Sequence, residues 1–551
     1  MDHSSTRRIG PEPHSDVEAV PCVLFEDDHI LVVNKPPGWN THAPSPYAGE
    51  GIYDWLRHRA PRWSNLSIIH RLDKETSGIL VFGKTRLANC SLTAQFEKRT
   101  VLKKYLFLSD RPGPQSALLV RTAIVREGAR FLCRPVGDRT QFAETRFRSL
   151  GSVGRYNLVQ AEPLTGKTHQ VRVHAAHAGF PVLGDKLYGG AHAPRVCLHA
   201  ASLTLHHPET GARLCFKSEP DWDTEPALAL RMAMIDPNQT NAFRVIHGAS
   251  DNYPGWFVDR LGDFLFSQKE LPLSQTERRK LEVLATRFKC HGVYHQQLLK
   301  HTQFPGRSSP SPVLVAGYDA ENRETRILEN GVSYLLRFGT SGSVGLFLDQ
   351  RDNRRRILRN HVAADFPLFE RPSAEMNVLN LFAYTSAFSV CAASTGAHTA
   401  SVDLSRKHLE WGRTNFELNG LDAGQHEFLV GDAFDWLRRL KRKQRKFNLV
   451  IIDPPTFSTS KTGGVFRVER DFGRLVFETV PLIVDGGVLF ASCNAVSYEP
   501  QRFVQDVLGA IRGSQAKCLK SHYAPQPPDF PTTSAQPAHL KSLWVRIGKS
   551  A

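Results

Sequence analysis

The segment NVLNLFAYTSAFSVCAASTGAHTASVDLS (residues 377–405) decides the fold of the C-terminal part of the chain. Two apolar strand patterns in it, NVLNLF and HTASVDLS, flank a helical stretch. The same alternation continues downstream through HEFLVGD (426–432), FNLVIIDPP (447–455) and GGVLFASC (486–493). Strands that alternate with helices at this spacing indicate a parallel, doubly wound sheet. We therefore expect a Rossmann-like domain over residues 336–551.

Acidic residues stand at the ends of three of these strands, where ligands bind in a doubly wound sheet. Asp403 comes about 22 residues after the first strand, the place of an acidic side chain that binds ribose hydroxyls. Asp432 and Asp453 follow the next two strands, and Pro454 and Pro455 fix the last loop because proline cannot continue a strand. Each aspartate could instead have a purely structural role, but three in succession indicate a ligand site.

The loop after the first strand, NLFAYTSAFSV (380–390), lacks the GxGxxG pattern of dinucleotide sites, which argues against an oxidoreductase. It resembles the FxYTGGFS loop of a methyltransferase group, with Ser386 and Ala387 where glycines are usual. GLFLDQRDNRRRI (345–357), DPPTFSTSK (453–461) and SDNYPGWFVDRLGDFLFSQ (250–268) extend the resemblance. Residues 240–551 thus resemble the RlmI/RlmK-like 23S rRNA base methyltransferases, with a small α+β domain before the catalytic one.

This resemblance implies S-adenosylmethionine as the cofactor of the C-terminal domain. It implies that Asp403 binds the ribose of the cofactor and Asp432 its adenine. The loop from Phe382 to Phe388 would hold the methionine end, with contacts from Phe382, Tyr384, Thr385 and Ser386. Asp453 would be catalytic as well as cofactor-binding, next to Pro454, and the RNA base would meet Pro455, Phe457 and Cys493.

Cys493 bears on which atom is methylated. C5 of cytosine is a poor nucleophile until a thiolate adds to C6, whereas N7 of guanine has its own lone pair. At this position the group's cytosine enzymes resemble SCS and its guanine-N7 enzymes carry SNN. The triplet Ser492-Cys493-Asn494 is intermediate between these two patterns. The segment DPPTFSTSK, with Thr456, is more similar to the guanine-N7 enzymes. A cysteine at a buried strand end is usually a small core residue. We favour N7 of guanine, with C5 of cytosine next.

A second candidate site lies in HRLDKETSGILV (70–81), a polar loop between two apolar strands. The neighbouring cations Arg71 and Lys74 should keep Asp73 ionised. An ionised, positioned carboxylate can act as a nucleophile, although an aspartate in a loop is more often a turn residue.

HRLDKETSGILV resembles the active-site motif of the RluA-like pseudouridine synthases. Three more blocks of that family follow its order: NKPPGWNTH (34–42), LTGKTHQVRVHAAHAGFPVLGDKLYG (164–189) and LHAASLTLHHPETG (198–211). The resemblance implies Asp73 as the catalytic aspartate, Tyr105 stacked on the target base and Arg172 paired with the carboxylate. Arg71 would fill the stack that the flipped base leaves, and Lys167 and His169 would contact RNA. No cofactor or metal is implied for this reaction.

The composition agrees with an RNA-binding, soluble protein. Lys and Arg exceed Asp and Glu by 16 charges, and such an excess favours polyanions. The nine cysteines form no CxxC pair, which argues against a zinc site and a disulfide framework. No apolar run approaches the length of a membrane helix, and the start of the chain is not a signal sequence. We expect a cytoplasmic protein that binds RNA, 23S rRNA above all, and neither DNA nor membrane; the sequence leaves the oligomeric state open.

The expected fold class is multidomain α/β with five segments. They are a disordered tail (1–20), an α+β pseudouridine synthase domain (21–222), a linker (223–238), a small α+β domain (239–335) and a methyltransferase domain (336–551). Few contacts should cross the Pro- and Asp-rich linker. The basic runs Arg354–Arg356 and Arg438–Lys446 could bind phosphates or be a solvated face. Two rival hypotheses are an enzyme with one active domain and one RNA anchor, and a non-catalytic ribosome assembly factor.

Overall fold

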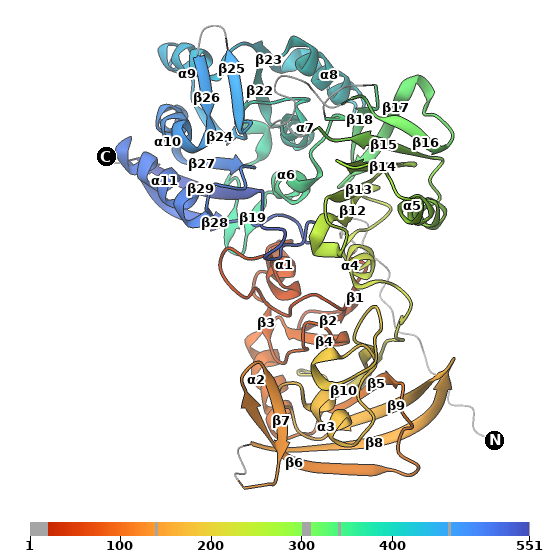
Figure 1. Ribbon diagram of the computed structural model, residues 1–551. Helices are drawn as coiled ribbons and strands as arrows, with labels where there is room; N and C mark the ends of the chain where they lie inside the picture. The colour runs from red at the N-terminus through yellow and green to blue at the C-terminus, as the bar shows by residue number, and fades with distance from the viewer. Residues whose placement is uncertain (1–19, 138–140, 300–309, 340–342, 461–463, 550–551) are drawn as a thin grey trace, which may run out of the picture.

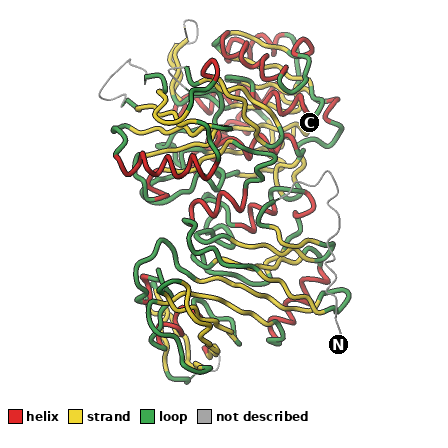
Figure 2. Tube along the Cα trace, turned by 90° about the vertical axis from the view of Figure 1, so that its right-hand side faces the viewer, coloured by secondary structure: helices red, strands yellow, loops and turns green. Residues whose placement is uncertain are grey.

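The computed structural model describes residues 20–137, 141–299, 310–339, 343–460 and 464–549. The predicted disordered tail lies almost wholly outside the described residues. Two views at right angles show an elongated molecule, with the N-terminal sheet in one half and the other sheets in the opposite half (Figures 1 and 2). Helices α1 (Ile52–Arg57) and α4 (Pro226–Met234) lie where the halves meet (Figure 1). Among the described residues, no helix has the length and apolar character that a membrane crossing requires.

The N-terminal half is built on one eleven-stranded sheet. Nine strands follow the order β1-β2-β4-β10-β5-β9-β8-β6-β7, while β3 pairs with β4 and β11 with β10. Helices α2 (Arg86–Glu97) and α3 (Gln170–His177) accompany it. The strands are β1 (Val23–Glu26), β2 (Ile30–Lys35), β3 (Ser67–Ile68), β4 (Ser77–Gly83), β5 (Leu102–Ser109), β6 (Leu118–Glu127), β7 (Arg130–Arg134), β8 (Phe142–Val153), β9 (Tyr156–Pro163), β10 (Leu198–His206) and β11 (Arg213–Lys217).

The middle part has a five-stranded sheet in the order β12-β13-β14-β15-β16, followed by the hairpin β17-β18. Helix α5 (Gln275–Phe288) connects β14 to β15, the parallel pair of this sheet. Ser274 begins the helix with a capping box, since it and Glu277 satisfy each other's backbone amides. The strands are β12 (Ala242–His247), β13 (Trp256–Leu261), β14 (Phe264–Lys269), β15 (Gly292–Gln297), β16 (Val313–Gly317), β17 (Glu324–Glu329) and β18 (Val332–Arg337).

The C-terminal sheet has the order β23-β22-β21-β24-β27-β29-β28. Its first five strands are parallel and β29 is antiparallel to both neighbours, so the prediction of a doubly wound sheet is confirmed. The strands of this sheet are β21 (Asn377–Leu381), β22 (His398–Asp403), β23 (Glu427–Val430), β24 (Phe447–Ile452), β27 (Ile483–Cys493), β28 (Ala516–Tyr523) and β29 (Lys541–Lys549). Two separate antiparallel pairs accompany it: β19 (His361–Ala363) with β20 (Phe366–Pro367), and β25 (Phe457–Ser460) with β26 (Gly464–Arg467). The helices are α6 (Arg351–Leu358), α7 (Ala387–Ser394), α8 (Arg406–Glu417), α9 (Ala433–Arg442), α10 (Val468–Thr479) and α11 (Pro500–Gly513).

The segment 223–238 contains helix α4 and is not a contact-poor linker, so that part of the prediction is wrong. Pro226 occupies the first turn of the helix, where proline is favoured, and Asp236 and Asn238 come only after its end. Leu230 and Met234 are buried in a hydrophobic cluster that runs from Val20 to Val293. The N-terminal and middle parts therefore share one continuous core.

The run Arg354–Arg356 does not bind phosphates, because each of its three side chains is only 2% exposed. Arg354 makes a bidentate pair with Glu329, at 2.6 and 2.8 Å. Arg355 donates to the carbonyl oxygens of Arg59 and His58 in the N-terminal half, and Arg356 donates to that of Val362. This part of helix α6 is thus an interior joint between domains, and the phosphate-binding interpretation is wrong for it.

Asp529 joins three parts of the chain from a position that is 0% exposed. Its carboxylate receives two hydrogen bonds from Arg351 of α6, at 2.8 and 2.6 Å, and one from the backbone amide of Arg244 in β12, at 3.1 Å. Its carbonyl oxygen accepts from Arg231 of α4, at 2.8 Å. Helix α4, the middle part and the C-terminal part are therefore held together at one buried residue.

We expect Asp529→Ala to lower the free energy of unfolding by about 3–5 kcal/mol, because it leaves the buried Arg351 cation without its partner. The control is Glu427→Ala, which breaks the largely exposed pair with Arg445 and should cost less than about 1 kcal/mol. Chemical denaturation followed by circular dichroism measures both. Similar small losses in the two variants would contradict the importance of Asp529.

Candidate active sites

The loop of Asp73 is held in place by the NKPPGWNTH block. Thr41 Oγ1 donates to the carbonyl oxygen of Leu72 at 2.9 Å and accepts from the amide of the same residue at 3.3 Å. The carbonyl oxygen of Lys74 accepts from the Gly38 amide at 2.8 Å and from Lys35 Nζ at 3.2 Å. Backbone contacts on both sides of Asp73 thus fix its position, which explains why the two sequence blocks occur together.

Gly78, at the end of HRLDKETSG, allows strand β4 to pair with β10. Its φ is +116°, and a Cβ atom there would lie 2.4 Å from the carbonyl oxygen of Ala200. Only glycine fits such an approach. The parallel pairing of Gly78 with Ala200 and of Ser77 with His199 brings LHAASLTLHHPETG beside the catalytic loop.

The charges around Asp73 come from the start of helix α3. Arg172 Nη1 lies 3.6 Å from Asp73 Oδ2 and 3.4 Å from Glu75 Oε2, while His169 Nε2 lies 4.0 Å from Asp73 Oδ2. The guanidinium of Arg172 is itself held by Asp185, with hydrogen bonds of 2.6 and 2.9 Å. Arg172 is thus buried and oriented toward the carboxylates of Asp73 and Glu75.

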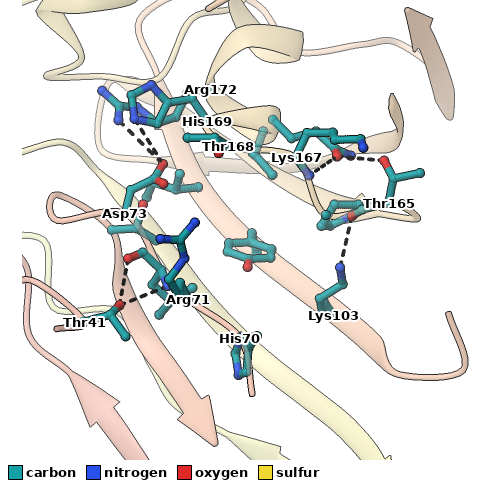
Figure 3. Close-up of a pocket in the computed structure, with 18 of the residues that line it drawn as sticks. Thr41, His70, Arg71, Asp73, Lys103, Thr165, Lys167, Thr168, His169 and Arg172 are labelled. Atoms are coloured by element: carbon teal, nitrogen blue, oxygen red, sulfur yellow. Dashed lines mark hydrogen bonds and ion pairs between the residues drawn. The ribbon is translucent and has the colours of Figure 1, made fainter. Parts of the chain in front are cut away.

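All six predicted residues of this site line one cleft of about 960 Å³: Arg71, Asp73, Tyr105, Lys167, His169 and Arg172. Figure 3 shows Asp73 and Arg172 on one side of the cleft and Lys103 with Thr165 on the other. Burial and the charge of Asp73 raise the pKa of Tyr105, so that its hydroxyl stays neutral. Burial lowers the pKa of Lys103 to about 8.

Two further residues of this site were not among the predicted ones. Asp185 orients Arg172, and Lys35 lies buried under the Asp73 loop. Burial lowers the pKa of Lys35 to about 7, and Asp73 opposes that shift. Both residues stand inside the quoted family blocks, so the signal was present, but position in a block does not reveal which neighbour a side chain supports.

In the C-terminal domain, the strand-end aspartates lie where they were predicted. Asp403 accepts hydrogen bonds from the backbone amides of Tyr384 and Ser405, both at 2.8 Å, and so ties the ends of β21 and β22 together. Asp432 caps helix α9 through the amides of Phe434 and Asp435. Both aspartates therefore shape the loops at this edge of the sheet.

The loop between β21 and α7 is strained. Phe382, Tyr384 and Ser386 have φ values of +59°, +49° and +59°, a left-handed conformation that costs a residue with a side chain about 1–2 kcal/mol. The Ser386 hydroxyl is buried and has no hydrogen-bond partner among the described residues. Gly412 of α8 faces it, and a Cβ at Gly412 would lie 2.5 Å from Ser386 Oγ. At Ser386 the backbone thus has a left-handed conformation that favours glycine, although the residue carries a side chain.

Asp453 is held between α6 and β27. Gln350 Nε2 donates to Asp453 Oδ2 at 3.0 Å and to Ser492 Oγ at 2.8 Å. Burial and then the charge of Asp349 raise the pKa of Asp453 to about 7. A carboxyl group that titrates near neutral pH can accept or donate a proton. Gln350 was not predicted as a site residue, although it stands in the quoted block GLFLDQRDNRRRI.

The residues predicted to meet the RNA base differ in exposure. Phe457 is 56% exposed and Pro455 is exposed beside it, whereas Cys493 is 0% exposed. Burial raises the pKa of the Cys493 thiol to about 11. Thr456 Oγ1 donates to Asn494 Oδ1 at 2.9 Å, which links the ends of β24 and β27. The polar groups at this edge are thus Thr456 and Asn494, and the thiol lies beneath them.

Comparison with known proteins assigns a family to each half of the chain. Residues 29–177 match the model of the RNA pseudouridylate synthase family, and residues 254–546 match that of the S-adenosylmethionine-dependent methyltransferases. The ribosomal large subunit pseudouridine synthase D of Zymomonas mobilis subsp. mobilis is 34% identical over 41% of this chain and 77% of its own length. The chain belongs to both families.

Two further relatives define the extent of the likeness. The ribosomal large subunit pseudouridine synthase C of Yersinia pestis is 39% identical over 34% of this chain and 62% of its own length, so the chain spans about three fifths of that relative. The Bacillus subtilis protein YwbD, named as a candidate ribosomal RNA large subunit methyltransferase, is 28% identical over 56% of this chain and 75% of its own length. The chain thus joins two family domains, and these relatives match one domain each.

The variant Ser386→Gly should raise the free energy of unfolding by about 1 kcal/mol. It removes left-handed strain and a buried hydroxyl without a partner, which outweighs the flexibility of glycine in the unfolded chain. Ser394→Gly, in ordinary helical conformation at the end of the same helix, is the control and should lose about 0.5–1 kcal/mol. Calorimetric unfolding compares them. Loss of stability in both variants would show that the loop is not strained.

Proposed function

We propose that the chain is a bifunctional RNA-modifying enzyme, which isomerises uridine to pseudouridine and methylates an RNA base with S-adenosylmethionine. The observation that carries the proposal is that one polypeptide holds two intact sites. The first is the Asp73–Arg172 cleft, and the second is the strand-end set around Asp453. The methyl group would come from the cofactor, held by the β21–α7 loop, Asp403 and Asp432.

The substrate we propose is large-subunit ribosomal RNA, 23S rRNA in the first place, in the cytoplasm. The names of the relatives support this choice, and so does the excess of 16 positive charges. The surface of helix α9 supports it as well, because Arg438, Arg439, Lys441 and Arg442 are exposed along it. We propose RNA, and neither DNA nor a membrane, as the partner.

In the proposed isomerisation, the carboxylate of Asp73 attacks the uridine, so that a bond to Asp73 forms and the bond between N1 and the ribose breaks. The freed uracil re-attaches through C5, and the bond to Asp73 breaks and releases the carboxylate. The proton lost from C5 is balanced by one gained at N1, so no oxidant or cofactor is required. Arg172 offers a positive charge beside Asp73, and the neutral ring of Tyr105 offers a face for the flipped base. Arg71 is exposed at the cleft and can fill the gap in the stack.

The variant Asp73→Asn should abolish pseudouridine formation and leave methylation unchanged, because it removes the nucleophile of one site only. Asp453→Asn should do the reverse, since it removes a carboxyl group that titrates near neutral pH. Asp110→Asn, an exposed aspartate at the end of β5, is the matched control. Tritium release from C5-labelled uridine and transfer of a labelled methyl group measure the reactions. Full tritium release by Asp73→Asn would refute the nucleophile assignment.

For the methylated atom, we propose N7 of guanine. The buried Cys493 thiol, with its raised pKa, is a poor source of the thiolate that C5 methylation of cytosine needs. The exposed pair Thr456 and Asn494 offers hydrogen-bonding groups that suit a guanine edge. C5 of cytosine remains the second candidate because a cysteine does stand at this strand end.

Cys493→Ala should therefore retain methyl transfer within a few-fold of the wild type, with the label in 7-methylguanosine. Cys391→Ala is the control for loss of a buried thiol away from Asp453. Digestion of labelled ribosomal RNA and chromatography of the nucleosides identify the product. A loss of several orders of magnitude, with 5-methylcytidine as the wild-type product, would reverse the assignment.

A further inference from the structure

Three potential metal ligands from distant parts of the chain meet at the interface of the two halves. Glu50 precedes helix α1, His58 caps the end of that helix, and His522 stands in β28, more than four hundred residues later. One nitrogen or oxygen atom of each lies within 4.8 Å of the others. His58 Nδ1 is 2.8 Å from Glu50 Oε1, and the His58 and His522 rings are 4.5 Å apart.

One nitrogen of this group is left without a hydrogen bond. His522 Nε2 is buried and has no partner among the described residues. A ring nitrogen without a hydrogen bond can offer its lone pair, and imidazole nitrogen is the commonest metal ligand in proteins. A buried polar atom without a partner is unfavourable, and a bound ion would remove that cost.

The position of these residues is fixed independently of any ion. Arg355 of α6 donates to the carbonyl oxygens of His58 and Arg59, so the end of α1 is anchored to the C-terminal half. Tyr47 packs edge-on against Tyr523, at 5.1 Å between ring centres, beside His522. The ligands are thus brought together by the fold, which reduces the entropy lost when an ion binds.

The electrostatic surroundings select the kind of ion. Glu50 supplies one negative charge, but the Arg356 guanidinium acts on both Glu50 and His522. The buried His361 also lies close to His522, and burial and nearby arginines lower its pKa to about 4. A hard cation such as Mg²⁺ or Ca²⁺ needs several carboxylates, which this site lacks. An ion that bonds strongly to imidazole is required.

We propose that Glu50, His58 and His522 bind a zinc ion, which ties the pseudouridine synthase domain to the last strands of the methyltransferase domain. Two histidines and one glutamate form a known type of zinc ligand set, with a fourth position for water. Zinc–ligand bonds of about 2.0–2.2 Å are reached from these distances by small rotations of the three side chains. The sequence holds no spacing motif for this site, because its ligands come from two domains.

The test is direct metal analysis of the full chain. The wild type is stripped with a chelator, dialysed against Zn²⁺ and analysed by plasma mass spectrometry. We expect about one zinc ion per chain and a rise in Tm of a few degrees relative to the stripped protein. His522→Ala should lose both the ion and the Tm response. The control His206→Ala, an exposed histidine on β10, should keep them.

A second measurement avoids dependence on the stability of the variants. Stripped wild-type protein is titrated with Co²⁺, whose visible absorption is intense only in a tetrahedral site. A saturable band that Zn²⁺ displaces would support the proposal, as would its loss in the conservative variant Glu50→Gln. Absence of the band, or equal zinc content in the wild type and His522→Ala, would overturn it.

Discussion

The buried carboxylate of Asp529 is the contact on which the arrangement of the domains depends. A charge in the interior is tolerated only when it is paired and hydrogen-bonded, and Asp529 obtains its partners from two domains. Arg351 is the first residue of α6 in the methyltransferase domain, and Arg244 belongs to β12 of the middle domain. Neither domain could rotate without exposing or unpairing a buried ion, so their relative position is fixed by electrostatics as well as by packing.

The fold of each domain could be predicted from the sequence because its signals are local. Apolar strands alternate with helices between 377 and 493, and the parallel sheet with Asp403, Asp432 and Asp453 at its edge followed from that pattern alone. The six predicted residues of the pseudouridine synthase site likewise line one cleft, since four ordered sequence blocks specify it.

The joints between domains could not be predicted, because a charged run has the same sequence whether it is exposed or buried. Arg354 is interior only because Glu329, from a separate hairpin, supplies its counter-charge. Helix α4 was mistaken for a linker because Pro, Asp and Asn break helices in the middle but flank them at the ends. Asp185, Lys35 and Gln350 were not predicted as site residues for a related reason. Each contacts a side chain or loop of a candidate site that lies elsewhere in the sequence.

Helix α6, together with the residue before it, contacts segments that hold both candidate sites in place. Gln350 donates to Asp453, and Asp352 lies against Trp55 and Arg59 of the N-terminal half. Helix α1, which contains Trp55, in turn donates from the Tyr53 amide to the carbonyl oxygen of Thr41, the residue that holds the loop of Asp73. A conformational change can pass along such a series of contacts only if one element has two discrete arrangements. The buried ion pairs of Arg351 and Arg354 hold α6 in one arrangement, so the helix acts as a common support for the loops of Asp73 and Asp453.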